Sequence, residues 1–430
     1  MPSWHGLGAL NLHHFFTALI HIPLAIQIVI YATPALVFAL SVLIFRALLK
    51  VQAYWTAALV FPAAYASMEY LLTLASPHGT AGSLAYSQLN FLPFLQLASI
   101  TGPSGMTFVL LLFSSGLVAA LYAQSTAPKQ ALRILAASIG LIGVILVLGV
   151  LRLSSSSSGP TVKVGLIATD LPEYEDVAGE GSPTLHLLQA YAGQAEVLAA
   201  KGAQAIVIPE KIGAIAESRS AEADSLLQSL ADKTDAVIVA GLVDDAPPLS
   251  YNQARVYAPH SATRKYDKHH MLPPFESRFK TGTTLTTLNV PSGKWGVEIC
   301  KDMDFTPLSR DYGRLGAGLM LVPAWDFVLD RFQHGHIAVM RGVEDGFSIA
   351  RAARDGYLTV SDNRGRILAE TRSNSSSFAT LLADVPTTHD STIYLRFGDW
   401  FSWLTIVILA GVLVQLTRAR QGAGLKRSGP

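Results

Sequence analysis

The sequence has apolar runs with almost no charge at both ends, and these runs enclose a stretch of ordinary globular composition. Very few charged side chains occur before Leu153 or within residues 400–416. Charged residues make up only 15% of the 430 residues, whereas a typical soluble protein has about 25%. Because about 20 apolar residues suffice for a helix to cross a bilayer, we predict a membrane protein with one globular domain between its spans.

The apolar stretches divide the chain into a simple order of parts. The predicted spans are residues 23–49, 54–74, 105–122, 134–151 and 400–416, and residues 12–32 could form a further span. We predict a membrane region over 1–152 with about four transmembrane helices, a Ser-rich linker over 153–160, a globular domain over 161–396, a transmembrane helix over 397–418 and a basic tail over 419–430. Glu69 lies within the second span, where a carboxylate is costly, so we expect it to face a cavity or protein partners.

The basic residues between the spans indicate an orientation. They cluster after the first span, before the fourth span and in the C-terminal tail, at Arg46, Lys50, Lys129, Arg133 and the tail residues. Following the spans in order puts these clusters on one side of the membrane and the globular domain on the other. By the positive-inside rule the clusters are cytoplasmic and the domain is outside.

Charge and cysteine content exclude some other classes. The net charge of +1 does not suggest a nucleic-acid partner. Cys300 is the only cysteine, which excludes an intrachain disulfide and a zinc site built from several cysteines.

The globular part alternates strand and helix patterns, which predicts an α/β domain. Expected strands are 162–168, 205–208, 236–242, 252–258, 285–290, 296–299 and 319–322, followed by a hairpin over 357–370. Expected helices are 184–201, 221–231, 333–354 and one that starts at Thr306 as N-cap with Pro307 at its first position.

Three reactive side chains follow the ends of predicted strands: Glu210, Lys268 and Cys300. Sites in α/β sheets form at the carboxyl ends of strands, so these groups can converge. Glu210 would take the proton of Cys300 and return it to a leaving group, while Lys268 and a backbone N–H would stabilise an oxyanion. We expect the low dielectric of the site, the neighbouring cation and a nearby helix N-terminus to lower the pKa of the cysteine.

Each of these residues also has a structural interpretation. Cys300 could be a buried thiol, Glu210 a helix cap and Lys268 a solvated loop residue. Glu276 could pair with Arg278 or Lys280 on the surface.

The histidines give only weak metal patterns. His269 and His270 could join Asp267 as ligands, but adjacent strand residues point apart, so we predict no metal site. His334 and His336 do not share a helix face, and we expect a core or interfacial role for them.

In Glu210, Lys268 and Cys300, which follow one another in this order, the chain resembles the nitrilase superfamily, whose members use a Glu-Lys-Cys triad on an α-β-β-α sandwich. Residues 266–276, YDKHHMLPPFE, are similar to the Tyr-Asn/Asp-Lys-x-His-Leu-x-Pro-Phe-Gly-Glu segment of the apolipoprotein N-acyltransferase family. Residues 84–110 resemble that family's segment between membrane helices, and MEYLL at 68–72 resembles its Leu-Glu-Trp-Leu-Arg. The expected fold is thus a nitrilase-like α-β-β-α sandwich flanked by transmembrane α-helices.

The chain departs from the family pattern in several places. The family usually has more membrane helices before the domain, so this N-terminal region looks shortened. Lys301 and Asp302 replace the Tyr-Glu that follows the family cysteine, PAWDF at 323–327 replaces Asn-Asp-Ala-Trp-Phe, and LPPFE lacks a glycine before Glu276. These changes leave the triad intact and put the acyl acceptor in doubt.

The resemblance implies a function. It is N-acylation of the terminal cysteine of a diacylglyceryl apolipoprotein by a membrane phospholipid, through a thioester on Cys300 and without a cofactor. Glu276 and Asp302 would position Lys268 and the amine, and Tyr86 and Gln88 are candidates for lipid contact. The implied location is the bacterial cytoplasmic (inner) membrane, with the catalytic domain on the periplasmic side.

Two alternatives remain open. In a membrane-anchored amidase of the nitrilase class, water would resolve the thioester. In a catalytically silent protein, the sandwich would only bind, but then the pocket would have no need of Glu210, Lys268 and Cys300 together.

Overall fold

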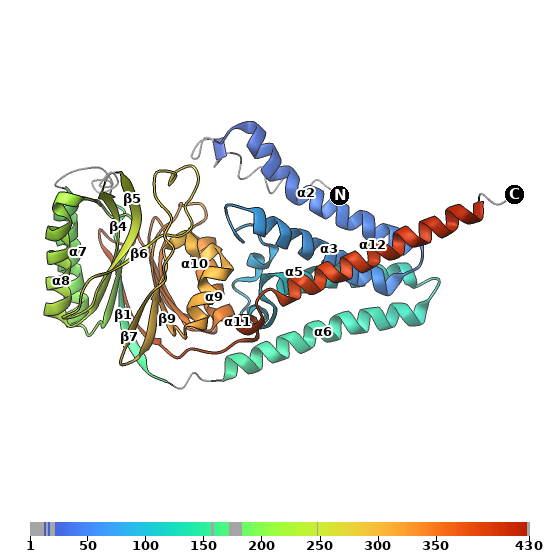
Figure 1. Ribbon diagram of the computed structural model, residues 1–430. Helices are drawn as coiled ribbons and strands as arrows, with labels where there is room; N and C mark the ends of the chain where they lie inside the picture. The colour runs from blue at the N-terminus through green and yellow to red at the C-terminus, as the bar shows by residue number, and fades with distance from the viewer. Residues whose placement is uncertain are drawn as a thin grey trace.

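The computed structural model describes residues 22–155, 159–171, 183–246 and 248–427, together with His13, Phe16 and Thr17. The described chain is elongated, with a two-sheet sandwich at one end and long helices at the other (Figure 1). Helix α6 leads directly toward the sandwich, and helix α12 returns from it, so the sandwich is inserted between helical parts of the chain.

Within the described residues, five helices are long and apolar enough to cross a membrane, as the sequence predicts. They are α2 (Leu24–Lys50), α3 (Tyr54–Ala75), α5 (Ala98–Ala123), α6 (Pro128–Ser154) and α12 (Trp400–Arg427). The short helices η2 (Leu84–Gln88) and α4 (Leu92–Leu95) connect α3 to α5. Helix α5 begins earlier than expected, and the φ of 63° at Gly102 marks a kink near its start.

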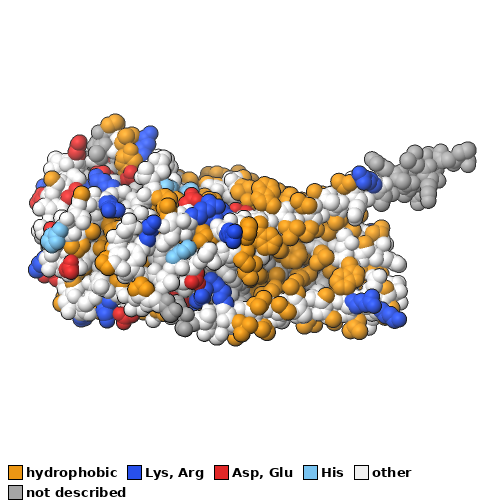
Figure 2. Space-filling view, turned by 60° about the horizontal axis from the view of Figure 1, so that its bottom comes forward, with side chains coloured by type: hydrophobic (Ala, Val, Ile, Leu, Met, Phe, Trp, Pro, Cys, Tyr) orange, Lys and Arg blue, Asp and Glu red, His pale blue; other side chains and the backbone are white. Residues whose placement is uncertain are grey.

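Hydrophobic side chains cover the surface of the helical part, and Lys and Arg side chains border this apolar area at both of its ends (Figure 2). The end of α2, the start of α6 and the end of α12 all lie away from the sandwich (Figure 1). The basic residues Lys50 and Lys129 therefore lie on the side opposite the sandwich.

Some predictions fall on parts of the chain that are not described. Most of residues 12–21, three residues of the Ser-rich linker and residues 428–430 lie outside the described ranges. The additional span within residues 12–32 and the domain limits remain predictions.

The sandwich contains two mixed sheets packed face to face. The first has the order β13-β1-β2-β4-β5-β6, with β3 paired to β4, and the second has the order β12-β11-β10-β9-β8-β7. The strands of the first sheet are β1 (Thr161–Ala168), β2 (Ala205–Ile208), β3 (Ala214–Ala216), β4 (Val237–Ala246), β5 (Leu249–Tyr257), β6 (Arg264–Asp267) and β13 (Ala379–Pro386). Those of the second are β7 (Thr286–Val290), β8 (Gly293–Val297), β9 (Leu319–Trp325), β10 (Ser348–Arg354), β11 (Tyr357–Ser361) and β12 (Ile367–Arg372).

Helices cover the outer face of each sheet, which confirms the α-β-β-α architecture (Figure 1). Helices α7 (Pro183–Ala200) and α8 (Glu217–Thr234) pack on the first sheet, and α9 (Thr306–Arg314) and α10 (Arg331–Asp345) lie on the second. A hydrophobic core from both sheets fills the space between them. The short helices η4 (Cys300–Asp304) and α11 (Ile393–Phe397) complete the domain.

Helix α10 also packs against the helical part of the chain. Its buried residues Ile337, Met340 and Val343 join one hydrophobic cluster with Phe94 and Leu95. A surface that would otherwise face water is thereby buried, and the sandwich is held against the membrane helices.

The predicted helix over 333–354 is wrong in its second half. Helix α10 ends at Asp345, because Gly346 adopts a left-handed φ of 78° and terminates it. Ser348–Arg354 instead form β10, which is buried at every residue between β9 and β11. Thr306 is the first residue of α9 rather than its N-cap, which is Phe305.

Gly241 in β4 allows the backbone of Pro209 and Glu210 to approach β4 closely. A Cβ at Gly241 would lie 2.4 Å from the Pro209 carbonyl oxygen and 2.5 Å from the Glu210 Cα. We expect Gly241→Ala to lower the thermal unfolding midpoint of the detergent-solubilised protein, since overpacking costs about 1–3 kcal/mol. Gly193 in α7 is the control, because its added Cβ would meet nothing within 4 Å, so Gly193→Ala should leave the midpoint unchanged or raise it. Equal midpoints for Gly241→Ala and the wild type would contradict this account.

Candidate active site

Glu210, Lys268 and Glu276 meet in the interior at one edge of the sandwich. Glu210 follows β2, Lys268 follows β6, and their side chains are only 1% and 2% exposed. The Lys268 Nζ lies 2.8 Å from Glu210 Oε1 and 2.8 Å from Glu276 Oε2. The sequence placed the first two groups together, and Glu276, which the family resemblance assigns to positioning Lys268, is the second carboxylate on the same ammonium.

Two further residues hold these carboxylates, and sequence reasoning missed both. The Asn252 Nδ2 on β5 donates to Glu210 Oε1 at 2.6 Å and to Glu276 Oε1 at 2.8 Å. The Lys211 Nζ lies 2.6 Å from Glu276 Oε1, and the Lys211 backbone has a left-handed φ of 50°. This backbone geometry gives Lys211 access to the same carboxylate cluster as its neighbour Glu210. Glu276 thus pairs with two lysines of the site, and not with Arg278 or Lys280 as its structural interpretation supposed.

In this cluster, each charged group stabilises the charged form of its partner of opposite sign. Burial lowers the pKa of Lys268, but the carboxylates of Glu210 and Glu276 raise it by more, so the pKa lies above its ordinary value. Burial raises the pKa of Glu276, but Lys268 and Lys211 outweigh burial and lower this pKa to about 2. Lys268 is therefore cationic and Glu276 anionic near neutral pH.

Cys300 begins the η4 turn that follows β8, and its φ of 45° lies in the left-handed region. Such a backbone conformation costs about 1–3 kcal/mol for a residue with a side chain, and strain of this kind is concentrated at functional sites. The residue is 8% exposed, and its thiol donates a long hydrogen bond of 3.5 Å to the Trp325 carbonyl oxygen.

The expected low pKa of Cys300 is wrong. Burial raises the pKa of the thiol well above its ordinary value, and the negative charge of Glu210 raises it further. Lys268 acts in the opposite direction but does not outweigh them. Glu210 and Lys268 thus both shift the pKa of the thiol, in opposite directions. In the resting site Cys300 is a neutral thiol.

Asp302 ties the nucleophile turn to the loop that follows β6. Its carboxylate accepts hydrogen bonds from the Tyr266 hydroxyl at 2.8 Å and from the His270 backbone N–H at 2.8 Å. It also accepts a longer bond from the Ile299 N–H at 3.3 Å. Asp302 thereby fixes the segments that carry Lys268 and Cys300 relative to each other.

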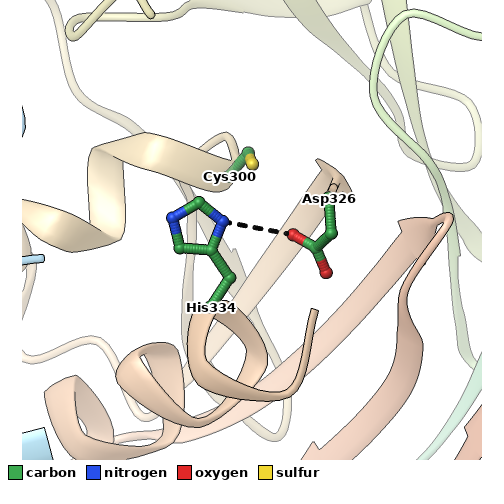
Figure 3. A group of neighbouring side chains, drawn as sticks. All are labelled: Cys300, Asp326 and His334. Carbon is green, nitrogen blue, oxygen red and sulfur yellow. Dashed lines mark ion pairs between the residues drawn. The ribbon is translucent and has the colours of Figure 1, made fainter. Parts of the chain in front are cut away.

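A histidine that the sequence assigned to a core or interfacial role lies beside the thiol. Atoms of Cys300, Asp326 and His334 all lie within 4.8 Å of one another (Figure 3). The His334 Nδ1 is 3.6 Å from Asp326 Oδ1, and its Nε2 is 3.5 Å from Asp304 Oδ2. Asp326 is also paired with Arg351, at 2.8 Å for one of its two contacts.

The carboxylates around His334 decide its charge. Burial lowers the pKa of His334, but Asp304, Asp326 and Asp330 raise it well above the ordinary value. His334, Asp304 and Asp326 therefore form a buried ion-pair network beside the thiol. The three residues weighed from the sequence as ligands do not converge, since Asp267 accepts from Gln253 while His270 stacks on Phe305.

The two candidates for lipid contact lie in η2. Tyr86 is 7% exposed, and its hydroxyl lies 2.5 Å from Thr80 Oγ1 and accepts from Arg341 Nη2 at 3.0 Å. Gln88 is half-buried. Tyr86 is thus placed in a polar network between the helices and the sandwich, and lipid contact by either residue stays a prediction.

The loop after α3 contacts the nucleophile turn directly. The backbone N–H and the hydroxyl of Thr80 both donate to the Asp304 carbonyl oxygen, at 2.9 and 2.7 Å. The Lys301 Nζ lies 3.1 Å from His78 Nδ1 and 3.6 Å from Asp304 Oδ2. Lys301, a departure from the family pattern, therefore connects the turn to the membrane part of the chain.

Two family models match the chain. The carbon-nitrogen hydrolase model matches residues 171–389, and the model of the apolipoprotein N-acyltransferase N-terminal domain matches residues 3–116. The chain belongs to the apolipoprotein N-acyltransferase family. With its apolar helices, this member of the carbon-nitrogen hydrolases is a multi-pass inner-membrane acyltransferase.

Curated proteins named apolipoprotein N-acyltransferase are similar to this chain over most of their length. The apolipoprotein N-acyltransferase of Geobacter metallireducens is 25% identical over 377 residues, which cover 80% of this chain and 71% of that protein. The one from Caulobacter vibrioides is 26% identical over 426 residues, covering 88% and 76% respectively. Among solved structures, an amidase of the nitrilase superfamily from Nesterenkonia AN1 is 20% identical with a TM-score of 0.47, covering 55% of this chain and 93% of that chain.

The charge of Glu210 is expected to suppress thiolate formation at Cys300. Iodoacetamide reacts with the thiolate, so the alkylation rate against pH reports the pKa of the thiol. Neutralising Glu210 in Glu210→Gln removes a negative charge and leaves Lys268 less compensated, so the midpoint should move to lower pH. Glu276→Gln is the matched control and should move it less, because Glu276 is not among the main influences on this thiol. A midpoint that is unchanged or higher in Glu210→Gln would refute the electrostatic assignment.

Proposed function

We propose that this protein transfers an acyl chain from a membrane phospholipid to the N-terminal cysteine amine of a diacylglyceryl apolipoprotein, through a thioester on Cys300. The observation that carries the proposal is the buried Lys268 ammonium, held between Glu210 and Glu276 and acting electrostatically on the Cys300 thiol. A thiol nucleophile, a proton acceptor and a fixed cation are the groups that acyl transfer requires. Family membership supports the same activity.

In the first half-reaction, Glu210 takes the thiol proton as Sγ attacks the ester carbonyl of the phospholipid. Because the resting thiol has a raised pKa, proton transfer accompanies attack, and no stable thiolate precedes it. The Lys268 ammonium and the backbone N–H of Lys301 stabilise the tetrahedral oxyanion. The C–O bond then breaks, Glu210 returns the proton to the leaving alkoxide, and a lysophospholipid departs from the Cys300 thioester.

In the second half-reaction, the amine of the apolipoprotein cysteine attacks the thioester carbonyl. Glu210 accepts a proton from the amine nitrogen, and Lys268 again stabilises the oxyanion. The C–S bond breaks, the proton passes to the leaving sulfur, and an amide is released. Glu276 and Asp302 act in both halves by holding Lys268 and the turn of Cys300 in place.

The second candidate is an amidase in which water resolves the thioester. The observation that favours it is the pair Lys301 and Asp302 after the cysteine, which departs from the family pattern at the site where an acceptor would approach. Against it stands the contact of the nucleophile turn with the membrane part of the chain, which suits lipid-borne substrates.

We further propose that the sandwich faces the periplasm. The basic ends of α2 and α6 lie on the side opposite the sandwich, and such clusters favour the cytoplasmic side. Substrates anchored in the outer leaflet would then reach the site laterally.

The thioester is tested by mass. Purified protein incubated with a phospholipid of defined acyl chains should gain the mass of one acyl chain, and hydroxylamine should remove it, because thioesters are labile to this nucleophile. Cys300→Ala should gain none, since it lacks the sulfur that carries the acyl group. Equal acyl gain by Cys300→Ala and the wild type would exclude a thioester on this residue.

The acceptor is tested with the isolated acyl-enzyme. Adding a diacylated lipopeptide with a free amine should discharge it at least tenfold faster than water alone and yield the N-acylated product. The same lipopeptide with an acetylated amine is the control and should not accelerate the loss. Discharge at one rate under all conditions, with free fatty acid as product, would favour the amidase.

Orientation is tested with fusions in a bacterial host. Alkaline phosphatase, which is active only in the periplasm, should be active when fused after Arg396 and inactive when fused within the tail after Arg427. The reverse pattern would place the sandwich in the cytoplasm.

A further inference from the structure

A pocket separate from the Lys268 cluster lies where the membrane helices meet the nucleophile turn. It has a volume of about 180 Å³ and is lined by parts of α3, the loop after α3, α5, the end of η4, the start of α9, α11 and the residue Asp399 just before α12. The described residues that line it include three carboxylates, Glu69, Asp304 and Asp399, and no Lys, Arg or His. A pocket with this lining favours a cationic group.

Two of the three carboxylates already have cationic partners. Asp304 is 3.6 Å from Lys301 and 3.5 Å from His334, and Asp399 is 3.2 Å from Arg310. These two charges are therefore balanced by the protein.

Glu69 differs from the other two. It accepts hydrogen bonds from Ser83 Oγ at 2.9 Å, the Leu84 N–H at 2.9 Å and Thr107 Oγ1 at 2.8 Å, all of them neutral donors. Among the described residues, no Lys, Arg or His lies within ion-pairing distance of it. The three donors hold the carboxylate in one orientation, and Glu69 is half-buried at the wall of the pocket. A carboxylate at membrane depth without a cation is costly, and such residues mark binding sites.

The start of α9 forms another part of the wall. Phe305, Thr306 and Pro307 line it, and the N-terminus of α9 has no side-chain cap. A helix N-terminus favours an anion, so the pocket offers an acceptor for a cation and, on another wall, a site that tolerates a phosphate. Apolar groups such as Leu74 and Pro103 complete the lining, which suits a headgroup attached to lipid chains.

We propose that Glu69 binds a primary ammonium carried by a lipid, and so holds a substrate beside the nucleophile turn. This inference rests on the proposed function for its role, although the binding itself does not require acyl transfer. Two substrates could carry that ammonium, the aminoalkyl headgroup of a phospholipid donor or the free amine of the lipopeptide acceptor. The chemistry is the same in both, namely a charge-assisted hydrogen bond from N–H to a fixed carboxylate.

Binding is measured with full-length protein carrying Cys300→Ala, which has no sulfur to acylate. The protein in detergent is equilibrated with equal amounts of phosphatidylethanolamine and phosphatidylglycerol of identical acyl chains, and the co-purified lipid is quantified by mass spectrometry. A parallel arm uses the diacylated lipopeptide with a free or an acetylated amine. In at least one arm the ammonium form should be retained roughly tenfold over its partner, because only the ammonium form can donate a charge-assisted hydrogen bond to the carboxylate.

Glu69→Gln should bring that preference close to one, because it keeps the shape and removes the charge. Glu222→Gln is the matched control, since it makes the same substitution at an exposed position of α8 outside the pocket, and it should retain the preference. Loss in the phospholipid arm identifies the donor headgroup, and loss in the lipopeptide arm identifies the acceptor amine. The inference is overturned if neither arm shows a preference, or if Glu69→Gln keeps the preference of its parent. Unchanged thermal unfolding midpoints ensure that both variants are folded, and a failed thioester test would leave this result unaffected.

Discussion

The arrangement of the site depends on burying the Lys268 ammonium together with two carboxylates. Moving an ion out of water costs several kcal/mol, and this is offset only where partners and hydrogen bonds satisfy it fully. Glu210 and Glu276 come from segments far apart in the chain, and Asn252 and Lys211 occupy further lone pairs of their oxygens. The ends of β2 and β6 must therefore stay in register across the sheet, because a displaced strand would leave a charge buried and unpaired.

The nucleophile is held differently from these charged groups. Cys300 is neutral at rest, strained in its backbone and close to a buried network of opposite charges around His334. The carboxylates of Asp304 and Asp326 both lie near His334 in this network. Asp304 also lies near Lys301, and Asp326 is also paired with Arg351. At rest the thiol donates to the Trp325 carbonyl oxygen, and the charges of Glu210 and Lys268 act on it in opposite directions.

The sequence predicted much of the site because strand ends are visible in an apolar pattern. Glu210 follows a short buried run that stops at Pro209, and the rule that strand ends converge then brings Lys268 and Cys300 to the same edge. Lys211 could not be found this way, since its role depends on a left-handed backbone that turns it back toward Glu276. Nothing in a single sequence signals such a turn at a lysine.

The errors have physical reasons as well. The sign of the cysteine pKa shift depends on how far burial outweighs a nearby cation, which spacing along the chain does not reveal. His334 was set aside because it shares no helix face with His336, but its partners come from η4 and the end of β9 rather than from its own helix. Residues 348–354 consist mainly of Ala and Arg, which favour helices, and only the left-handed turn at Gly346 separates them from α10.

The two hydrogen bonds from Thr80 to the Asp304 carbonyl oxygen join the membrane half of the protein to the turn that carries the nucleophile. A sandwich excised from its helices would expose this carbonyl to solvent and lose one wall of the turn. The helices thus support the turn that begins at Cys300, and a soluble fragment would lack this support.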